Sequence, residues 1–365
     1  MLGSSSVNCR NGGSIMDQAQ ISFDLVGSAL GEDILSDQGI LLLKKGTILK
    51  EVHILLLQKY RFGKTVSVNL NKEIHKESPA ALPYQTNQAY IKDTFQSFYR
   101  RKEINIVLLR ERFHPLIELS LCDVSILKVL QTTGKRDEKL YQHSINVAIL
   151  SSIIGKLLGY KKKDCLLLAD MGLFHEIGML GIEQNIYKHS ASVDNEEMQK
   201  HTEIGHKLLS TIPYINSLIP LAALHHHEKL DGTGYPHQLK EKDIPYFVQI
   251  VSVADCFNAA YINSQDSNEN KPHFAGVYEL IEKSQRNELN PSIVIPFVRY
   301  IMRQNLLQKV RLSNGEEAQI VFIHENEPYQ PLVKVGEEYV DLRREAGVRI
   351  LSLLEEDIKD SQTIA

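Results

Sequence analysis

The stretch His225–Pro236, HHHEKLDGTGYP, is the most informative part of the chain for its fold. It places three consecutive histidines at the end of an expected helix, and a turn with two glycines and a proline follows at once. Histidine accounts for only 14 of 365 residues, and packing gives no reason to gather three of them. Such a run favours metal binding or acid–base chemistry, which requires partners elsewhere in the chain.

The composition is that of an ordinary globular protein, with 43% hydrophobic and 24% charged residues. A net charge of −4 gives no reason to expect DNA or an anionic membrane as a partner. No run of about 18 apolar residues occurs, so no membrane span is predicted. The cysteines form no CxxC pair, which favours a reducing, cytoplasmic location and argues against a cysteine-based zinc site. The four cysteines are Cys9, Cys122, Cys165 and Cys256.

The hydrophobic pattern changes twice along the chain, which predicts a mainly α protein with small flanking domains. An N-terminal α+β domain and a proline-containing linker precede a long region with apolar residues at spacings of three and four. Alternating strands then surround Asn314-Gly315, a strong hairpin signal. The predicted parts are a disordered leader 1–19, an N-terminal domain 20–70, a linker 71–87, a helical domain 88–305, a β appendage 306–355 and a tail 356–365.

Further histidines and carboxylates interrupt the apolar stripes of the helical region. His143 and His201 lie on such stripes, His175-Glu176 interrupts an apolar run, and Asp255 lies on the apolar face of FVQIVSVADCFNAA. Each has a simple structural explanation, because a lone histidine is usually a hydrogen-bonded core residue and a buried aspartate is often ion-paired. Five imidazoles and two carboxylates together favour a cluster of iron, manganese or zinc. Two such metals would bind a phosphate ester.

The order of these motifs resembles the HD-GYP family, an all-α subgroup of the HD phosphohydrolase superfamily. The motifs are HSINV, FHEIGMLGI, Lys188, EEMQKHTEIG, HHEKLDGTGYP and IPYFVQIVSVADCFNA. The resemblance covers roughly residues 125–300. It implies an HD-type helical bundle and hydrolysis of the bacterial second messenger cyclic di-GMP to the linear dinucleotide or GMP.

The resemblance also implies a role for individual positions. The implied ligands are His143, His175 and Asp255 for one metal and His201, His226 and His227 for the other, with Glu176 bridging them. The implied catalytic residues are Glu176, Asp255 and Lys188, and the implied substrate-binding residues are Met179, Asp231, Gly232, Gly234, Tyr235 and Pro236. Lys139 replaces the glutamate that helps some members hold a third metal, so two divalent ions, iron or manganese, are expected. His225 falls at a variable position, so we expect it to be outside the ligand shell or exposed.

The chain departs from the family pattern mainly in its cations. Glu176 replaces the aspartate of the HD pair, Met179 replaces a phosphate-binding lysine and Gln249 replaces an arginine; the segment NSQDSNENKP contains no arginine. Losing one charge-assisted phosphate contact costs about 1.5–3 kcal/mol. Lys188 or Lys271 could compensate. If the helix continues beyond His175, Met179 faces the same side one turn later, and we expect Met179→Lys to raise turnover.

These departures leave three functions open. The leading hypothesis is a cytoplasmic cyclic di-GMP phosphodiesterase. The alternative is a degenerate module that keeps its metals and binds a nucleotide or a protein without efficient catalysis, and a third is hydrolysis of another phosphate ester. Protein partners that bind through the GYP loop, and a homodimer, are further expectations.

Overall fold

In the computed structural model, the chain forms two compact units, Met1–Lys76 and Glu77–Ala365. The structure describes residues 16–20, 25, 29–35, 41–47, 49, 53–54, 57, 65–69, 81–121, 138–182, 196–266 and 274–354.

The N-terminal unit contains a three-stranded antiparallel sheet and a separate two-stranded pair. The sheet has the order β1-β5-β2, and the pair joins β3 to β4. Alternation in TVSVN makes β5 the central strand, in which Val66 and Val68 are fully buried. The strands are β1 (Met16–Gln20), β2 (Ala29–Leu30), β3 (Ile34–Leu35), β4 (Leu41–Leu43) and β5 (Thr65–Asn69).

The predicted disordered leader is wrong for its last four residues. Residues 16–19 belong to β1, which pairs with β5 from Met16↔Asn69 to Gln20↔Thr65. The segment MDQAQ has no apolar alternation, and its place in the sheet comes from backbone hydrogen bonds to a neighbouring strand. Residues 1–15 lie outside the described part of the chain.

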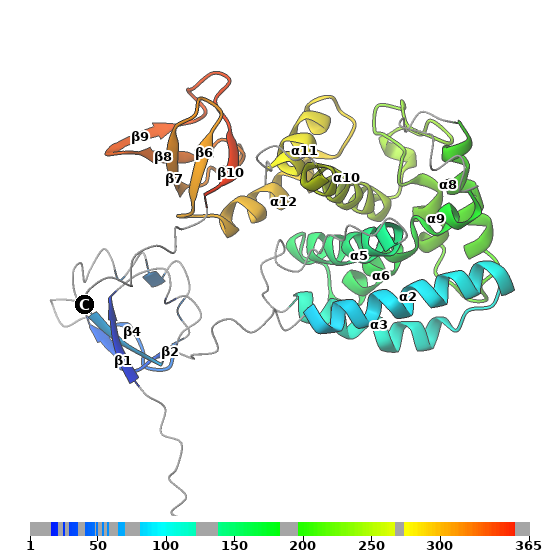
Figure 1. Cartoon of the computed structure of the whole chain (residues 1–365), viewed down its shortest axis with the longest axis horizontal. Coiled ribbons are helices and arrows are strands. Elements are labelled where there is room, and N and C mark those ends of the chain that lie inside the picture. The colour runs from blue at the N-terminus through cyan, green and yellow to red at the C-terminus, as the bar shows by residue number, and fades with distance from the viewer. Residues whose placement is uncertain are drawn as a thin grey trace, which may run out of the picture. The chain divides into compact units, whose positions relative to one another are not determined.

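The second unit is a helical bundle, as predicted, in which α5 is the central helix (Figure 1). Nearly every α5 side chain from Tyr141 to Gly155 is buried, and α5 packs on α6, α10, α3 and α2. No helix among the described residues is both long and apolar enough to cross a membrane. The helices are α2 (Ala81–Arg101), α3 (Ile106–Leu121), α5 (Lys139–Leu157), α6 (Lys162–Phe174), η3 (Ile177–Gly181), α8 (Glu196–Leu209), α9 (Leu218–His225), η4 (Glu241–Asp243), α10 (Tyr246–Asp266), α11 (Ala275–Gln285) and α12 (Pro291–Gln304).

The predicted linker is wrong for residues 81–87, which form the first two turns of α2. Pro83 argued against a helix there. A proline is tolerated in the first turn, however, because the backbone nitrogens of that turn have no intrahelical acceptor in any case.

The C-terminal strands form a five-stranded antiparallel sheet with the order β10-β6-β7-β8-β9. The predicted Asn314-Gly315 hairpin joins β6 to β7, and Gly315 has a φ of +89°. This sheet belongs to the same compact unit as the helices. The backbone N–H of Ile350 donates to the Tyr278 hydroxyl on α11 at 2.9 Å. The strands are β6 (Lys309–Leu312), β7 (Glu317–Phe322), β8 (Leu332–Val335), β9 (Glu338–Asp341) and β10 (Ile350–Leu353).

Candidate metal centre

One group of metal-ligating side chains comes from α5, the end of α6 and α10. His143 lies on α5, His175 directly follows α6, and Asp255 lies on α10. Nε2 of His143 lies 3.1 Å from Nε2 of His175 and 3.0 Å from Oδ1 of Asp255. The same carboxylate oxygen lies 3.7 Å from Nε2 of His175. Three donor atoms from distant parts of the sequence therefore converge.

A second group combines Glu176 with histidines of α8 and the end of α9. Nε2 of His201 lies 3.4 Å from Nε2 of His226 and 3.5 Å from Oε2 of Glu176. Oε1 of Glu176 lies 3.9 Å from Nε2 of both His226 and His227. Glu176 also has an oxygen within 4.8 Å of the ligand atoms of His143 and His175. The Glu176 carboxylate is therefore shared by the two groups.

In three of the histidines, the ring nitrogen that faces away from the centre, Nδ1, is hydrogen-bonded to a backbone carbonyl. Nδ1 of His175, His201 and His226 lies 2.7, 2.6 and 2.9 Å from a carbonyl oxygen three or four residues earlier. A carbonyl can only accept, so each Nδ1 carries the proton. Each Nε2 then presents its lone pair to the centre, which is the arrangement found in histidine metal ligands.

His143 is oriented by Asn258, one turn beyond Asp255 on α10. The Asn258 amide lies 2.6 Å from Nδ1 of His143, and its Oδ1 atom has no hydrogen-bond partner among the described residues. Amide nitrogen and oxygen exchange places on a half-turn of the side chain. With the oxygen towards the ring, Asn258 accepts from Nδ1–H and leaves Nε2 free to bind a cation. The sequence motifs did not indicate a role for Asn258, although its spacing of three residues from Asp255 places both on the same helix face.

The two carboxylates of the centre are held in their ionised form, and they favour positive charge on two of the five histidines. Burial raises the pKa of Asp255 and of Glu176, but the surrounding histidines outweigh it and hold both well below their usual range. Burial disfavours the charged form of His143 and of His226, yet the neighbouring carboxylates raise the pKa of both. Two ionised carboxylates inside a protein require compensating cations.

The chemistry of the donor set fits metal ions better than it fits internal hydrogen bonds. Two pairs of Nε2 atoms face each other at 3.1 and 3.4 Å, and when all four rings are neutral and protonated at Nδ1 they have only lone pairs to offer there. Oε2 of Glu176 is buried and receives no hydrogen bond from any residue that the structure describes. Cations would satisfy both features. Imidazole and carboxylate are ligands of divalent transition metals, so the cluster is suited to bind them.

Two glycines allow the ligand-bearing elements to approach each other closely. A Cβ atom on Gly172 of α6 would lie 2.8 Å from the Val147 carbonyl oxygen on α5. A Cβ atom on Gly178 of η3 would overlap the His201 carbonyl on α8. Backbone contact at these crossings sets the spacing between helices, and hence between the two histidine groups.

In the turn at residues 231–236, the Asp231 side chain forms its hydrogen bonds inside the turn itself. The Asp231 carboxylate accepts from the Thr233 backbone N–H at 2.9 Å and from its hydroxyl at 2.8 Å. Gly232 has a φ of +83°, a conformation that glycine adopts without strain. Asp231 is exposed, so its side chain stabilises the turn.

The second half of the turn packs on the histidines. A Cβ atom on Gly234 would overlap the backbone of residues 227–229. The Tyr235 ring lies 4.7 Å from the His227 ring, and Pro236 follows in a half-buried position. The Glu228 carboxylate accepts from the backbone N–H groups of His237 and Leu239 at 2.7 and 2.9 Å and closes the turn.

The predicted position of Met179 relied on a continuous helix, which is wrong. Helix α6 ends at Phe174, and Met179 lies in the 3-10 helix η3, where its N–H donates to the Glu176 carbonyl at 3.0 Å. A 3-10 helix has three residues per turn, so a spacing of four does not keep two side chains on one face. Lys188 and Lys271 lie outside the described residues.

Gln249, which replaces an arginine of the family pattern, is buried and hydrogen-bonded within the protein. Its Oε1 accepts from the Asn290 side chain at 2.8 Å, and its Nε2 donates to the Ile244 carbonyl at 2.9 Å. Asn290 also caps α12 by accepting from the Ser292 N–H. The buried Gln249 amide therefore links α10 to the start of α12.

His225 does not point into the centre, but it is buried rather than exposed. Its Nε2 lies 3.1 Å from Nδ1 of His237. Burial and the neighbouring histidines lower its pKa to about 4, so the ring is neutral at pH 7. Neither ligand group includes it.

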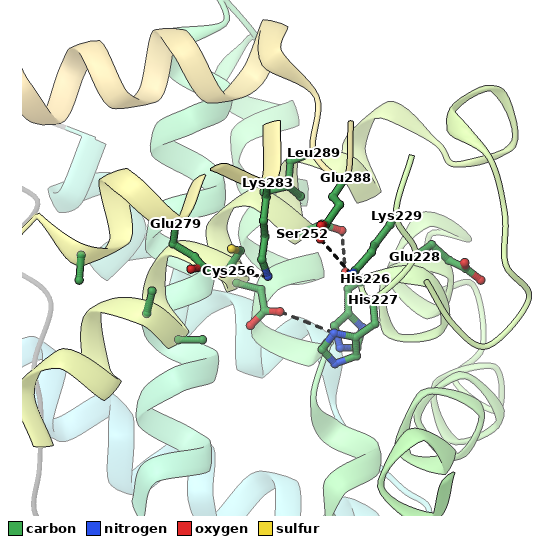
Figure 2. Close-up of a pocket in the computed structure, with 14 residues that line it drawn as sticks. His226, His227, Glu228, Lys229, Ser252, Cys256, Glu279, Lys283, Glu288 and Leu289 are labelled. Atoms are coloured by element: carbon green, nitrogen blue, oxygen red, sulfur yellow. Dashed lines mark hydrogen bonds and ion pairs between the residues drawn. The ribbon is translucent and has the colours of Figure 1, made fainter. Parts of the chain in front are cut away.

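A cavity of about 620 Å³ opens beside the centre. Figure 2 shows His226 and His227 on one side of it, and Glu279 and Lys283 of α11 on the other. The six predicted substrate-binding residues are not among its described lining residues. Lys283 gave no signal in the sequence, because a lysine four residues after a glutamate is typical of any exposed helix.

Comparisons with known proteins locate the similarity in this helical region. Residues 129–290 match the HD domain family model. The chain is 31% identical over 179 residues to a cyclic di-GMP phosphodiesterase of Thermotoga maritima, which covers 48% of each chain. It is 30% identical to cyclic di-GMP phosphodiesterase PdeB of Borreliella burgdorferi, over 52% of this chain and 50% of that one.

A third relative differs in its named substrate. The chain is 32% identical to 3'3'-cGAMP-specific phosphodiesterase 3 of Vibrio cholerae, over 32% of this chain and 26% of the relative. The chain spans about half the length, or less, of these curated relatives.

Proposed function

We propose that the protein is a metal-dependent phosphodiesterase that hydrolyses cyclic di-GMP to the linear dinucleotide or GMP, because residues 129–290 match the HD domain family model. The observation that carries the proposal is the pair of ligand groups that share Glu176. The similarity to two named cyclic di-GMP phosphodiesterases supports the substrate class.

The protein's own residues would hold two divalent ions and keep the site charged for them. His143, His175 and Asp255 would bind one ion. His201, His226 and His227 would bind the other, and Glu176 would contribute to both groups. When bound, a pair of such ions activates water and neutralises charge on a phosphate ester. Imidazole is a ligand for iron and carboxylate is a ligand for manganese, so this mixed set suits either metal. Asp255 and Glu176 stay ionised because the histidines lower their pKa values.

A binding module without efficient catalysis is the alternative, and one observation favours it. The two lysines among the described lining residues of the cavity are each paired with a glutamate. Lys229 lies 2.9 Å from Glu288, and Lys283 lies 3.3 Å from Glu279. A lysine already neutralised in this way attracts a phosphate less strongly. A cytoplasmic location, protein partners at the GYP loop and a homodimer remain predictions.

The test combines metal analysis with product analysis. Protein purified without oxygen and loaded with iron or manganese should contain about two ions per chain and convert cyclic di-GMP to linear product, resolved by chromatography. 3'3'-cGAMP should be compared under the same conditions, because one relative is named for it. Tight cyclic di-GMP binding without product at full metal content would support the binding module and reject the enzyme.

A further inference from the structure

The cavity joins the metal centre to a cationic group on α11. His226, His227 and Asp255 belong to both the cavity wall and the ligand groups, while Lys283 extends from α11 to the level of Cys256 (Figure 2). Three alanines, at positions 259, 260 and 275, also line the cavity. A ligand at the metals can therefore extend towards Lys283.

The two lysines of the cavity wall differ in how firmly they are held. Lys229 lies 2.9 Å from Glu288, whose side chain is only 12% exposed. Lys283 lies 3.3 Å from Glu279, whose side chain is 43% exposed. An exposed ion pair contributes little free energy and separates easily. Lys283 is therefore the cation that can exchange its glutamate for an incoming anion.

Lys283 also remains charged in this position. Burial lowers its pKa, but Cys256 and Glu279 outweigh that effect and raise it above the usual value. An ammonium group binds phosphate as a compact point charge with three donors.

We infer that Lys283 binds the second phosphate of a cyclic dinucleotide whose first phosphate lies at the metal centre. This inference rests on the proposed function and narrows the substrate to diesters with two phosphates. The phosphates of a cyclic dinucleotide lie on opposite sides of its ring, so one at the metals directs the other away from them. A cavity of about 620 Å³ is within the size range of small-molecule sites. Lys283 would supply a cation on the substrate side, where Met179 and Gln249 do not.

The test measures equilibrium binding to the full metal-loaded chain. The probe is the bis-phosphorothioate analogue of cyclic di-GMP, in which sulfur replaces one non-bridging oxygen of each phosphate and slows hydrolysis. Lys283→Met should weaken binding about tenfold, Lys283→Arg should restore most of it, and Glu279→Gln should tighten it a few-fold by freeing the ammonium. Metal content should stay at the wild-type level.

A matched control is available on α8. Lys207 forms the same kind of pair with a glutamate four residues earlier, at 3.8 Å, and it is not among the described lining residues of the cavity. Lys207→Met removes a more exposed ion pair of the same spacing and should leave analogue binding at the wild-type level. Equal binding by Lys283→Met and Lys207→Met would overturn the inference.

Hydrolysis of two substrates separates this inference from the proposed function. Bis(p-nitrophenyl) phosphate has one phosphodiester and no second phosphate for Lys283 to bind, so Lys283→Met should impair its hydrolysis far less than that of cyclic di-GMP. Equal losses for both substrates would mean that Lys283 acts through the metal centre, and would overturn the inference. A wild type that hydrolyses neither substrate, yet binds the analogue through Lys283, would reject the enzyme and keep the inference.

Discussion

The turn at residues 231–236 follows His226 and His227 of the metal centre in sequence, but the polar groups of the turn and of the centre are used differently. In the centre, histidine rings bind outer acceptors through Nδ1 and turn Nε2 inwards. In the turn, Asp231 binds Thr233, and the glycine backbone packs on residues 227–229. The glycine-containing turn therefore supplies shape, whereas the chemical groups come from the histidines before it and from helices far apart in the chain.

The largest expected effect comes from the three consecutive histidines, of which His226 is a predicted metal ligand and His225 is not. His226→Ala removes an inward Nε2 from the second group, so we expect loss of metal and a fall in cyclic di-GMP hydrolysis of about 10³-fold or more. His225→Ala, one residue earlier, should keep nearly normal metal content, because that ring points to His237. Elemental analysis of both variants measures the metal content per chain. Equal metal loss would show that His225 is a ligand.

The next effect concerns the residue that orients His143. Asn258→Ala removes the acceptor for Nδ1–H, and loss of such a partner weakens metal binding by about 10–100-fold. Asn258→Asp retains an oxygen at that place and should restore most of the affinity. Competition with a chelator measures both variants. Full affinity in the alanine variant would mean that Asn258 only fills space.

A substitution in the turn should act through shape. Gly234→Ala introduces a methyl group that overlaps the backbone of residues 227–229, and overpacking of this kind costs about 1–3 kcal/mol. Because His227 belongs to that segment, metal content should fall together with the melting temperature. Gly315→Ala is a useful comparison, because its Cβ would meet nothing within 4 Å and its cost comes from positive φ alone. Normal stability and metal content in Gly234→Ala would contradict the packing role.

The smallest effect is expected at Asp231. Asp231→Ala removes two exposed hydrogen bonds to Thr233, which should reduce the free energy of unfolding by about 0.5 kcal/mol. The KM for cyclic di-GMP should stay near the wild-type value, because the side chain faces its own turn. Thermal melting and initial rates measure the two quantities. A KM raised tenfold at unchanged stability would place Asp231 on the substrate, as its family position implies.

Local patterns predicted element types well. Apolar spacings of three and four indicated the helical region that contains most of α2 and all of α3 and α5, and Asn314-Gly315 indicated the β6–β7 hairpin. Predictions failed where tertiary contacts outweighed local preference. Polar MDQAQ became a strand through backbone pairing, and helix α6 ended at Phe174, so that Met179 lies in η3.

The sequence by itself determined which side chains are available for metal chemistry, because imidazoles and carboxylates on apolar helix faces require a partner or a cation. The motif order also indicated how they group, and the structure brings all seven together. Only the tertiary structure decided the side-chain partners of Asn258, Gln249 and Lys283. Those depend on which helices touch and at what distance, and glycine crossings such as Gly172 and Gly178 set that distance through contacts between residues far apart in the chain.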